Sequence, residues 1–337
     1  MSRAPRPLRV GLVGCGHIAP FHVDAWLRSR GAVLTCVCDR VASRAAALAP
    51  SGASIYRDLG RMLAEEELDV LDIAASSEAH LEMVRMAAAR GVHVLCQKPL
   101  GDTVAEAKAA SRACARAGTR LMVMEVARFL PWIAAIVERL PRVGPPRVLR
   151  YRGERDPMRV RALFSGQPYL RRQARLIVKE RISHAIDVAR LLLGDADSVY
   201  CSAARFDPSL AGEHDAVLVV EHRSGSRSIH DFSWTRSAGR ERWSDGEILL
   251  EGDRGALHFR LGQGDLRWIG RAVKTIGSFD FGEGFRLGFH RAIDSFLAAI
   301  QGGIPFEYEP ADHIATLEVV AAAYASIESR RPERCRR

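Results

Sequence analysis

No apolar run in the 337-residue sequence approaches the roughly 18 to 20 residues that a membrane-spanning helix needs. Internal repeats and low-complexity tracts are also missing, apart from alanine-rich segments. Residues 1–7 are basic and proline-rich and lead directly into a predicted strand, which does not resemble a secretory signal peptide. We therefore expect a cytoplasmic globular protein with no membrane partner, long enough for two domains.

Lysine is scarce. Only four of the 49 basic residues are lysine, and the arginines are scattered along the chain rather than clustered. The net charge of +9 comes without a homeodomain, zinc-finger or RNA-binding signature. We therefore expect no nucleic-acid partner, although the positive field favours an anionic substrate or cofactor.

The seven cysteines are odd in number, and several lie in or beside predicted strands. This placement is typical of small buried hydrophobic residues in a reducing cytoplasm. Cys36 and Cys38 share one strand, whereas a zinc pair needs a turn and two further ligands, so we predict no metal site.

A glycine turn follows the first predicted strand, Leu8 to Val13. Its residues Gly14, Gly16 and Ala19 match G-x-G-x-x-A, a form of the dinucleotide fingerprint. The first glycine permits a tight turn, the second lets backbone N–H groups approach a pyrophosphate, and the third small residue lets the helix pack on the strand. The same pattern also occurs in ordinary strand-to-helix turns. We assign the whole turn to cofactor binding, including His17 and Ile18.

An acidic residue ends the second predicted strand, 32–38. Asp39 lies 20 residues beyond Ala19, at the distance where a carboxylate accepts hydrogen bonds from the adenosine ribose. Because a carboxylate repels a 2′-phosphate, NAD is favoured over NADP. The adjacent Arg40 leaves NADP open, since a guanidinium binds phosphate well.

The rest of the chain predicts two domains. Helices at 78–90 and 103–117, the second with a Thr103–Glu106 capping box, alternate with strands at 92–96 and 121–126. The fold class is therefore α/β, with a doubly wound parallel sheet of the Rossmann type in residues 1–126. Short strands at 216–222, 227–232, 247–250 and 256–260 predict an α+β domain with an open, mainly antiparallel sheet in residues 127–337.

Two helices close the second predicted domain. Phe285, Phe289, Phe296 and Ile300 recur at helical spacing in the first, and Ile314, Leu317, Ala321 and Tyr324 do so in the second. We interpret both sets as core. The open sheet face would carry substrate contacts or a subunit interface.

Lys98 lies just beyond the carboxyl end of the predicted strand 92–96 and precedes Pro99. Ligands of open α/β sheets bind beyond the carboxyl ends of the strands, so this lysine would point toward the nicotinamide end of the cofactor. Near a cationic ring its charged form is disfavoured, and it can exchange a proton with a substrate hydroxyl. The alternative is a solvated loop lysine.

A polar stripe marks a predicted helix from Glu180 to Leu193. Glu180, His184 and Asp187 are spaced i, i+4, i+7 and therefore share one face. Such a stripe needs either satisfied hydrogen bonds or a polar cleft. Histidine can act there as a general acid or base, tuned by the neighbouring carboxylates.

Together these motifs resemble the glucose-fructose oxidoreductase / inositol dehydrogenase / MocA family over nearly the whole chain. The resemblance rests on the glycine turn with Asp39, Ala75 to His80, Gln97-Lys98-Pro99, Ala127 to Pro131, His184 to Asp187, and Glu307 to Pro310. It implies NAD or NADP as cofactor and a sugar, sugar derivative or cyclitol as substrate. It places Lys98 and His184 at the catalytic lysine and histidine positions.

We accordingly predict catalytic roles for Lys98, His184 and Glu180. Further cofactor contacts are assigned to Ser76, His80 and Gln97, and substrate contacts to Arg128 and Asp187. Two residues depart from the family pattern: Gln97 replaces a glutamate, and Glu180 stands where many members have aspartate.

The leading hypothesis is an NAD(P)-dependent dehydrogenase or reductase acting on a secondary alcohol or ketone. One alternative is a non-catalytic dinucleotide sensor on the same scaffold. Others keep the enzyme class and change the substrate to a dihydrodiol, a tetrapyrrole double bond or a nucleotide-linked sugar. We expect a homodimer or homotetramer.

Overall fold

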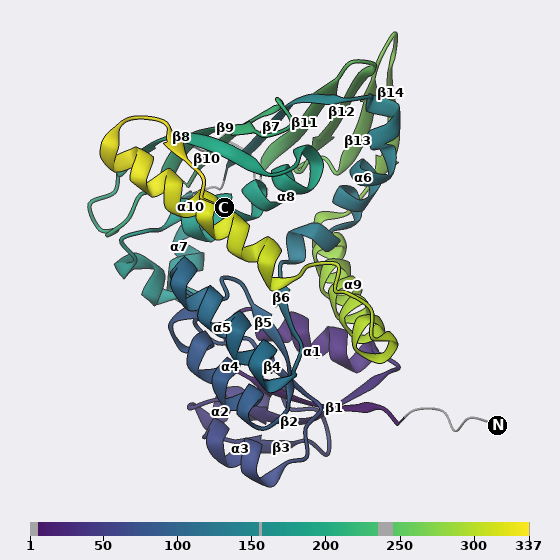
Figure 1. The fold of residues 1–337 in the computed structure, drawn as a ribbon, viewed down its shortest axis with the longest axis vertical. Coiled ribbons are helices and arrows are strands. Elements are labelled where there is room, and N and C mark those ends of the chain that lie inside the picture. Colours follow the sequence, from purple (N-terminus) through teal and green to yellow (C-terminus); the bar gives the residue numbers. More distant parts are fainter. Residues whose placement is uncertain (1–5, 155–156, 235–244, 337) are drawn as a thin grey trace, which may run out of the picture. The chain divides into compact units, whose positions relative to one another are not determined.

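The chain folds into two compact units in a computed structural model that describes residues 6–154, 157–234 and 245–336. The first unit comprises residues up to 126 together with 286–314, and the second comprises 127–285 together with 315–336 (Figure 1). We assigned all of 127–337 to the second domain. Residues 286–314 of that predicted domain group with the first unit in the structure.

The first unit is built on a parallel sheet. Within the described residues its strands run in the order β3-β2-β1-β4-β5-β6, the doubly wound order of dinucleotide-binding folds. The central strands are buried on both faces, as their apolar sequences require. The strands are β1 (Leu8–Val13), β2 (Ala32–Cys38), β3 (Ser54–Tyr56), β4 (Val70–Ile73), β5 (His93–Gln97) and β6 (Leu121–Met124).

Helices connect these strands. The predicted capping box is confirmed: Thr103 Oγ1 accepts from the Glu106 N–H at 3.2 Å, and the Glu106 carboxylate accepts from the Thr103 N–H at 3.0 Å. The helix predicted at 78–90 begins at His80, after a 3-10 turn over Ser77–Ala79. The helices are α1 (Ala19–Arg28), α2 (Ala42–Leu48), α3 (Leu59–Glu65), α4 (His80–Ala89) and α5 (Val104–Ala117).

Helix α9 (Phe281–Gly302) explains why residues 286–314 join the first unit. Phe289 stacks on Phe21 with ring centroids 5.3 Å apart, and Phe296 meets Trp26 edge-on at 6.3 Å. Both α9 rings are fully buried. Phe289 and Phe296 of the predicted stripe are therefore core of the first unit, whereas Phe285 and Ile300 are half-buried and Phe285 belongs to the second unit.

The second unit contains a larger sheet. Its described strands are ordered β14-β13-β12-β11-β7-β10-β9-β8-β15, and all neighbours are antiparallel except β7 and β10. The open, mainly antiparallel sheet is confirmed. The strands are β7 (Pro146–Glu154), β8 (Ala196–Ala204), β9 (Asp215–His222), β10 (Arg227–Ser233), β11 (Asp245–Gly252), β12 (Gly255–Arg260), β13 (Asp265–Ile269), β14 (Val273–Ser278) and β15 (Glu333–Arg334).

Helices of the second unit pack against one face of this sheet, which leaves strand residues such as Tyr200 exposed on the other. On the covered face Trp132 stacks on Phe259 at 5.2 Å. The helices are α6 (Pro131–Val143), α7 (Pro157–Gly166), α8 (Ser183–Leu193) and α10 (Pro310–Ser329), of which α10 begins in the first unit. No helix in the described part of the chain is long and apolar enough to cross a membrane.

Helix α10 differs from its predicted pattern at one position. Leu317 and Tyr324 are buried as expected, whereas Ala321 is exposed. The helix buries most of its circumference, including Val319, Val320 and Ala323, so only a narrow line of residues reaches solvent.

Candidate functional site

The glycine turn has the geometry of a phosphate cradle. Gly14 adopts φ +92°, and a Cβ atom there would lie 2.6 Å from the Ala75 nitrogen, so only glycine fits. Gly16 is exposed, and a Cβ atom there would meet no atom within 4 Å. The space beside Gly16 is therefore open to a ligand. His17 lies exposed beside it, and Ile18 is half-buried.

Helix α1 presents its N-terminus to the same turn. Ile18 at its N-cap supplies no side-chain cap, and the first turn carries no acidic residue. First-turn N–H groups and the helix dipole suit a diphosphate there. The open space and the uncapped helix end together fit a dinucleotide.

Asp39 ties the end of β2 to the glycine turn. Its Oδ2 accepts from the Cys15 N–H and its Oδ1 from the Val41 N–H, both at 2.8 Å. A carboxylate has about four lone-pair sites, so two backbone bonds leave capacity for ribose hydroxyls. The neighbouring Arg40 is exposed.

The segment after β4 carries Ser76 and His80. Ser76 is exposed, and its hydroxyl donates to Glu78 at 3.3 Å. His80 is 1% exposed, with Nδ1 2.8 Å from the Pro99 carbonyl and Nε2 3.0 Å from the Ala75 carbonyl. Burial lowers the pKa of His80, against the two carbonyls, which raise it. Both ring nitrogens thus face the backbone, which makes His80 a support for the loop that carries Lys98.

Lys98 follows β5, beyond the carboxyl edge of the parallel sheet where the glycine turn also lies. Its side chain is half-buried, and its backbone N–H donates to Gln97 Oε1 at 2.8 Å. Gln97 itself is buried, with its Nε2 3.1 Å from His22 Nε2. His22 was missed by the sequence reasoning, because its partners lie on other elements.

In the second unit the predicted polar helix has two parts. Residues Val178–Ile182 form a π-helical turn, and α8 begins only at Ser183. Glu180 lies in the π turn and His184 in the first turn of α8, and both are half-buried. π turns recur at functional sites because they change the direction of neighbouring side chains.

Asp187 lies on the inner side of α8. It is fully buried and accepts from Arg128 Nε at 2.7 Å, Arg128 Nη2 at 3.2 Å and Thr316 Oγ1 at 2.9 Å. The Arg128 side chain is itself only 10% exposed. The pair predicted to contact substrate is therefore an internal ion pair that fastens the segment after β6 to α8 and α10.

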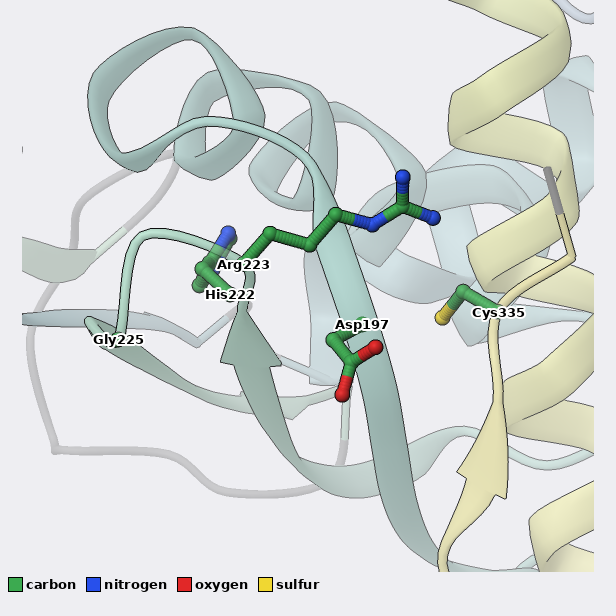
Figure 2. A pocket seen from close by; sticks show the side chains of 5 residues that line it. All are labelled: Asp197, His222, Arg223, Gly225 and Cys335. Atoms are coloured by element: carbon green, nitrogen blue, oxygen red, sulfur yellow. The ribbon is translucent and has the colours of Figure 1, made fainter.

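A hollow of about 530 Å³ lies in the second unit, beside strands β8, β9 and β15, and none of the predicted site residues lines it (Figure 2). Asp197, Arg223 and Cys335 line it. Burial, followed by the Asp197 charge, raises the pKa of the Cys335 thiol to about 11. Burial also lowers the pKa of His222. At neutral pH the thiol is therefore protonated, and this hollow holds no activated nucleophile.

Comparisons with known proteins identify both units. Residues 8–125 match the model of an oxidoreductase family with an NAD-binding Rossmann fold, and residues 150–258 match the GFO/IDH/MocA C-terminal domain. The chain is 36% identical to a D-apiose dehydrogenase of Paraburkholderia graminis, over 73% of this chain and 66% of that protein. It is 33% identical to a D-apiose dehydrogenase of Rhizobium rhizogenes, over 76% of this chain and 74% of the relative.

A solved structure covers almost the whole chain. An oxidoreductase from Agrobacterium radiobacter, in complex with NAD⁺, L-tartaric acid and magnesium, is 28% identical, covers 97% of this chain and 98% of its own, and superposes with a TM-score of 0.90. The fold is thus shared with that oxidoreductase. The chain belongs to the glucose-fructose oxidoreductase / inositol dehydrogenase / MocA family of oxidoreductases.

Proposed function

We propose that the protein is an NAD-dependent dehydrogenase that oxidises a secondary alcohol of a sugar, sugar derivative or cyclitol, or reduces the matching ketone. The main support for this proposal is the position of Lys98. Its backbone N–H is hydrogen-bonded, and the residue lies at the carboxyl edge of the parallel sheet, where the glycine turn also lies. The names of relatives, apiose and inositol dehydrogenases among them, support a polyhydroxylated substrate.

We assign cofactor binding and proton transfer to different residues of the chain. The amides at Gly16 and α1 bind the diphosphate, and Asp39 binds the adenosine ribose and disfavours a 2′-phosphate. NAD, when bound, supplies a nicotinamide that accepts or donates hydride. Lys98 transfers the hydroxyl proton, and His184 holds that hydroxyl or shares the transfer, with Glu180 orienting the imidazole.

The test is a rate assay with matched lysine variants. Purified protein is incubated with NAD or NADP and a panel of pentoses, branched sugars, aldonates and inositols, and NADH absorbance is followed. Lys98→Ala should lower kcat by at least 10²-fold on the best substrate. The control is Lys274→Ala on the exposed strand β14, which should keep full activity. Full turnover by Lys98→Ala would remove its role, and tight NAD binding without turnover on any substrate would favour the sensor.

We propose further that the protein assembles as a homodimer or homotetramer through the open face of the large sheet. Tyr200 and Val217 on that face are 42% and 39% exposed, beside Val219 and Ile229 in register. Exposed apolar side chains rimmed by charge are typical of subunit interfaces. Val217→Asp should reduce the mass measured by light scattering, and an unchanged mass would exclude this face.

We also propose a cytoplasmic location. All seven cysteines are free, and six of them are buried, which suits a reducing compartment. Cell fractionation of the tagged protein tests it, and recovery in a membrane or extracellular fraction would contradict it.

A further inference from the structure

A buried polar chain in the first unit ends on the backbone of Lys98. Asp72 on β4 meets His22 on α1, with Oδ2 and Nδ1 2.8 Å apart. His22 Nε2 lies 3.1 Å from the amide nitrogen of Gln97, whose Oε1 accepts the Lys98 N–H at 2.8 Å. Asp72 and His22 are fully buried, so neither touches a ligand directly.

The hydrogen-bond network determines where the protons lie. Trp26 Nε1 can only donate, and it lies 2.6 Å from Asp72 Oδ2, which is therefore an acceptor. His22 must then donate to the same oxygen through Nδ1. In a neutral ring this leaves Nε2 as an acceptor, so the Gln97 amide donates to it and turns its Oε1 toward Lys98.

Packing alone does not explain why these polar side chains are buried, because their burial is unfavourable for folding. Asp72 Oδ1 is buried and has no hydrogen-bond partner among the residues the structure describes. A buried acceptor without a partner is unfavourable, and an apolar replacement for such a chain is often neutral or stabilising. The arrangement therefore points to a positioning role at the end of the chain, on Lys98.

Two neighbouring backbone groups are held in the same way. The Pro99 carbonyl is bound by His80 Nδ1 at 2.8 Å, and the Leu100 N–H donates to His313 Nε2 at 3.1 Å. Buried side chains thus hold three successive residues, beginning with Lys98. A loop fixed at this many points presents its side chain in one direction.

We propose that Asp72, His22 and Gln97 are positioning residues that orient Lys98, and that residue 97 must be an amide because only an N–H donor matches His22 Nε2. This proposal rests on the proton-transfer role proposed for Lys98. A carboxylate at position 97 would still accept the Lys98 N–H. Its other oxygen would face the lone pair of His22, unless the ring gained a second proton.

Two variants separate positioning from folding. The groups that face the His22 ring are the Asp72 carboxylate from β4, the Gln97 amide from β5 and the Phe289 ring from α9. Gln97→Glu should lower kcat about tenfold at pH 8 with little change in substrate KM.

His22→Leu should lower kcat by a similar factor, since leucine offers the Gln97 amide no acceptor. The matched control is His93→Leu at the other end of β5, where the ring accepts from the Arg120 N–H. That variant should lose stability and keep kcat. Wild-type kcat in folded Gln97→Glu and His22→Leu would overturn the proposal.

A second readout needs no substrate. Because the chain has only four lysines, reductive ¹³C-methylation produces few NMR signals, each assignable with a Lys→Arg variant. The Lys98 signal should shift in His22→Leu and Gln97→Glu, while the Lys274 signal stays in place. An unmoved Lys98 signal would also overturn the proposal. If the wild type turns over no substrate, the proposed function fails. The Lys98 signal still decides whether the Asp72–His22–Gln97 chain orients Lys98.

Discussion

Replacing Asp187 by asparagine should destabilise the second unit by about 3 to 5 kcal/mol. The carboxylate is fully buried and accepts two bonds from Arg128 and one from Thr316. Asparagine keeps the shape, but it removes the negative charge that faces the Arg128 guanidinium, which is 10% exposed, and the largely buried Arg190 side chain 3.9 Å away. A buried charge that loses its partner cannot recover the lost attraction from water, and this sets the size of the effect.

The assay is urea unfolding followed by tryptophan fluorescence, with Asp253→Asn as the control. Asp253 also forms a two-bond pair with an arginine, Arg147, at 2.7 and 3.0 Å, but the two side chains are 44% and 66% exposed. Water screens that pair, so its loss should barely move the unfolding midpoint. Equal midpoints for the two variants would refute the argument that burial of the Arg128–Asp187 pair determines its contribution.

Further predictions concern the cradle and the thiols. Gly14→Ala should destabilise the fold by about 1 to 3 kcal/mol because of its φ and the nearby Ala75 nitrogen, whereas Gly16→Ala should keep the melting temperature and weaken NAD binding in a titration. Asp39→Ser should raise the NADP-to-NAD affinity ratio, measured by calorimetry, and an unchanged ratio would contradict its role. Cys335, with its pKa raised to about 11, should be only about 0.1% thiolate at pH 8. A disulfide reagent should therefore label it slowly in the native protein and quickly in urea.

The parallel sheet was predictable because its signals are local. The glycine turn lies between β1 and α1, and the capping box joins Thr103 to Glu106, three residues away. The antiparallel strands were found for the same reason, since short alternating runs are separated by turns. The grouping of 286–314 with the first unit was not predictable, because Phe289 and Phe296 show only that a helix has an apolar face, and several sheets could cover it.

The Asp72–His22–Gln97 chain had only faint signals in the sequence. An aspartate inside the wholly buried strand β4 and a histidine on the inner side of α1 are each unusual. Either could have been flagged as a buried polar group in need of a partner. The partners are 50 and 75 residues apart in sequence, and without a second sequence for comparison no local pattern connects them.

The polar stripe at Glu180, His184 and Asp187 shows that helical spacing alone does not predict the partners of a side chain. Spacing correctly placed His184 and Asp187 on one helix, but it carries no information about what the stripe faces. The π turn over Val178–Ile182 separates Glu180 from the regular helix, and Asp187 meets Thr316, 129 residues further along the chain. A carboxylate on such a helix can bind a ligand only if it is not already paired with a buried arginine. Arg128 reaches Asp187 here, and the catalytic roles of Glu180 and His184 stay predictions.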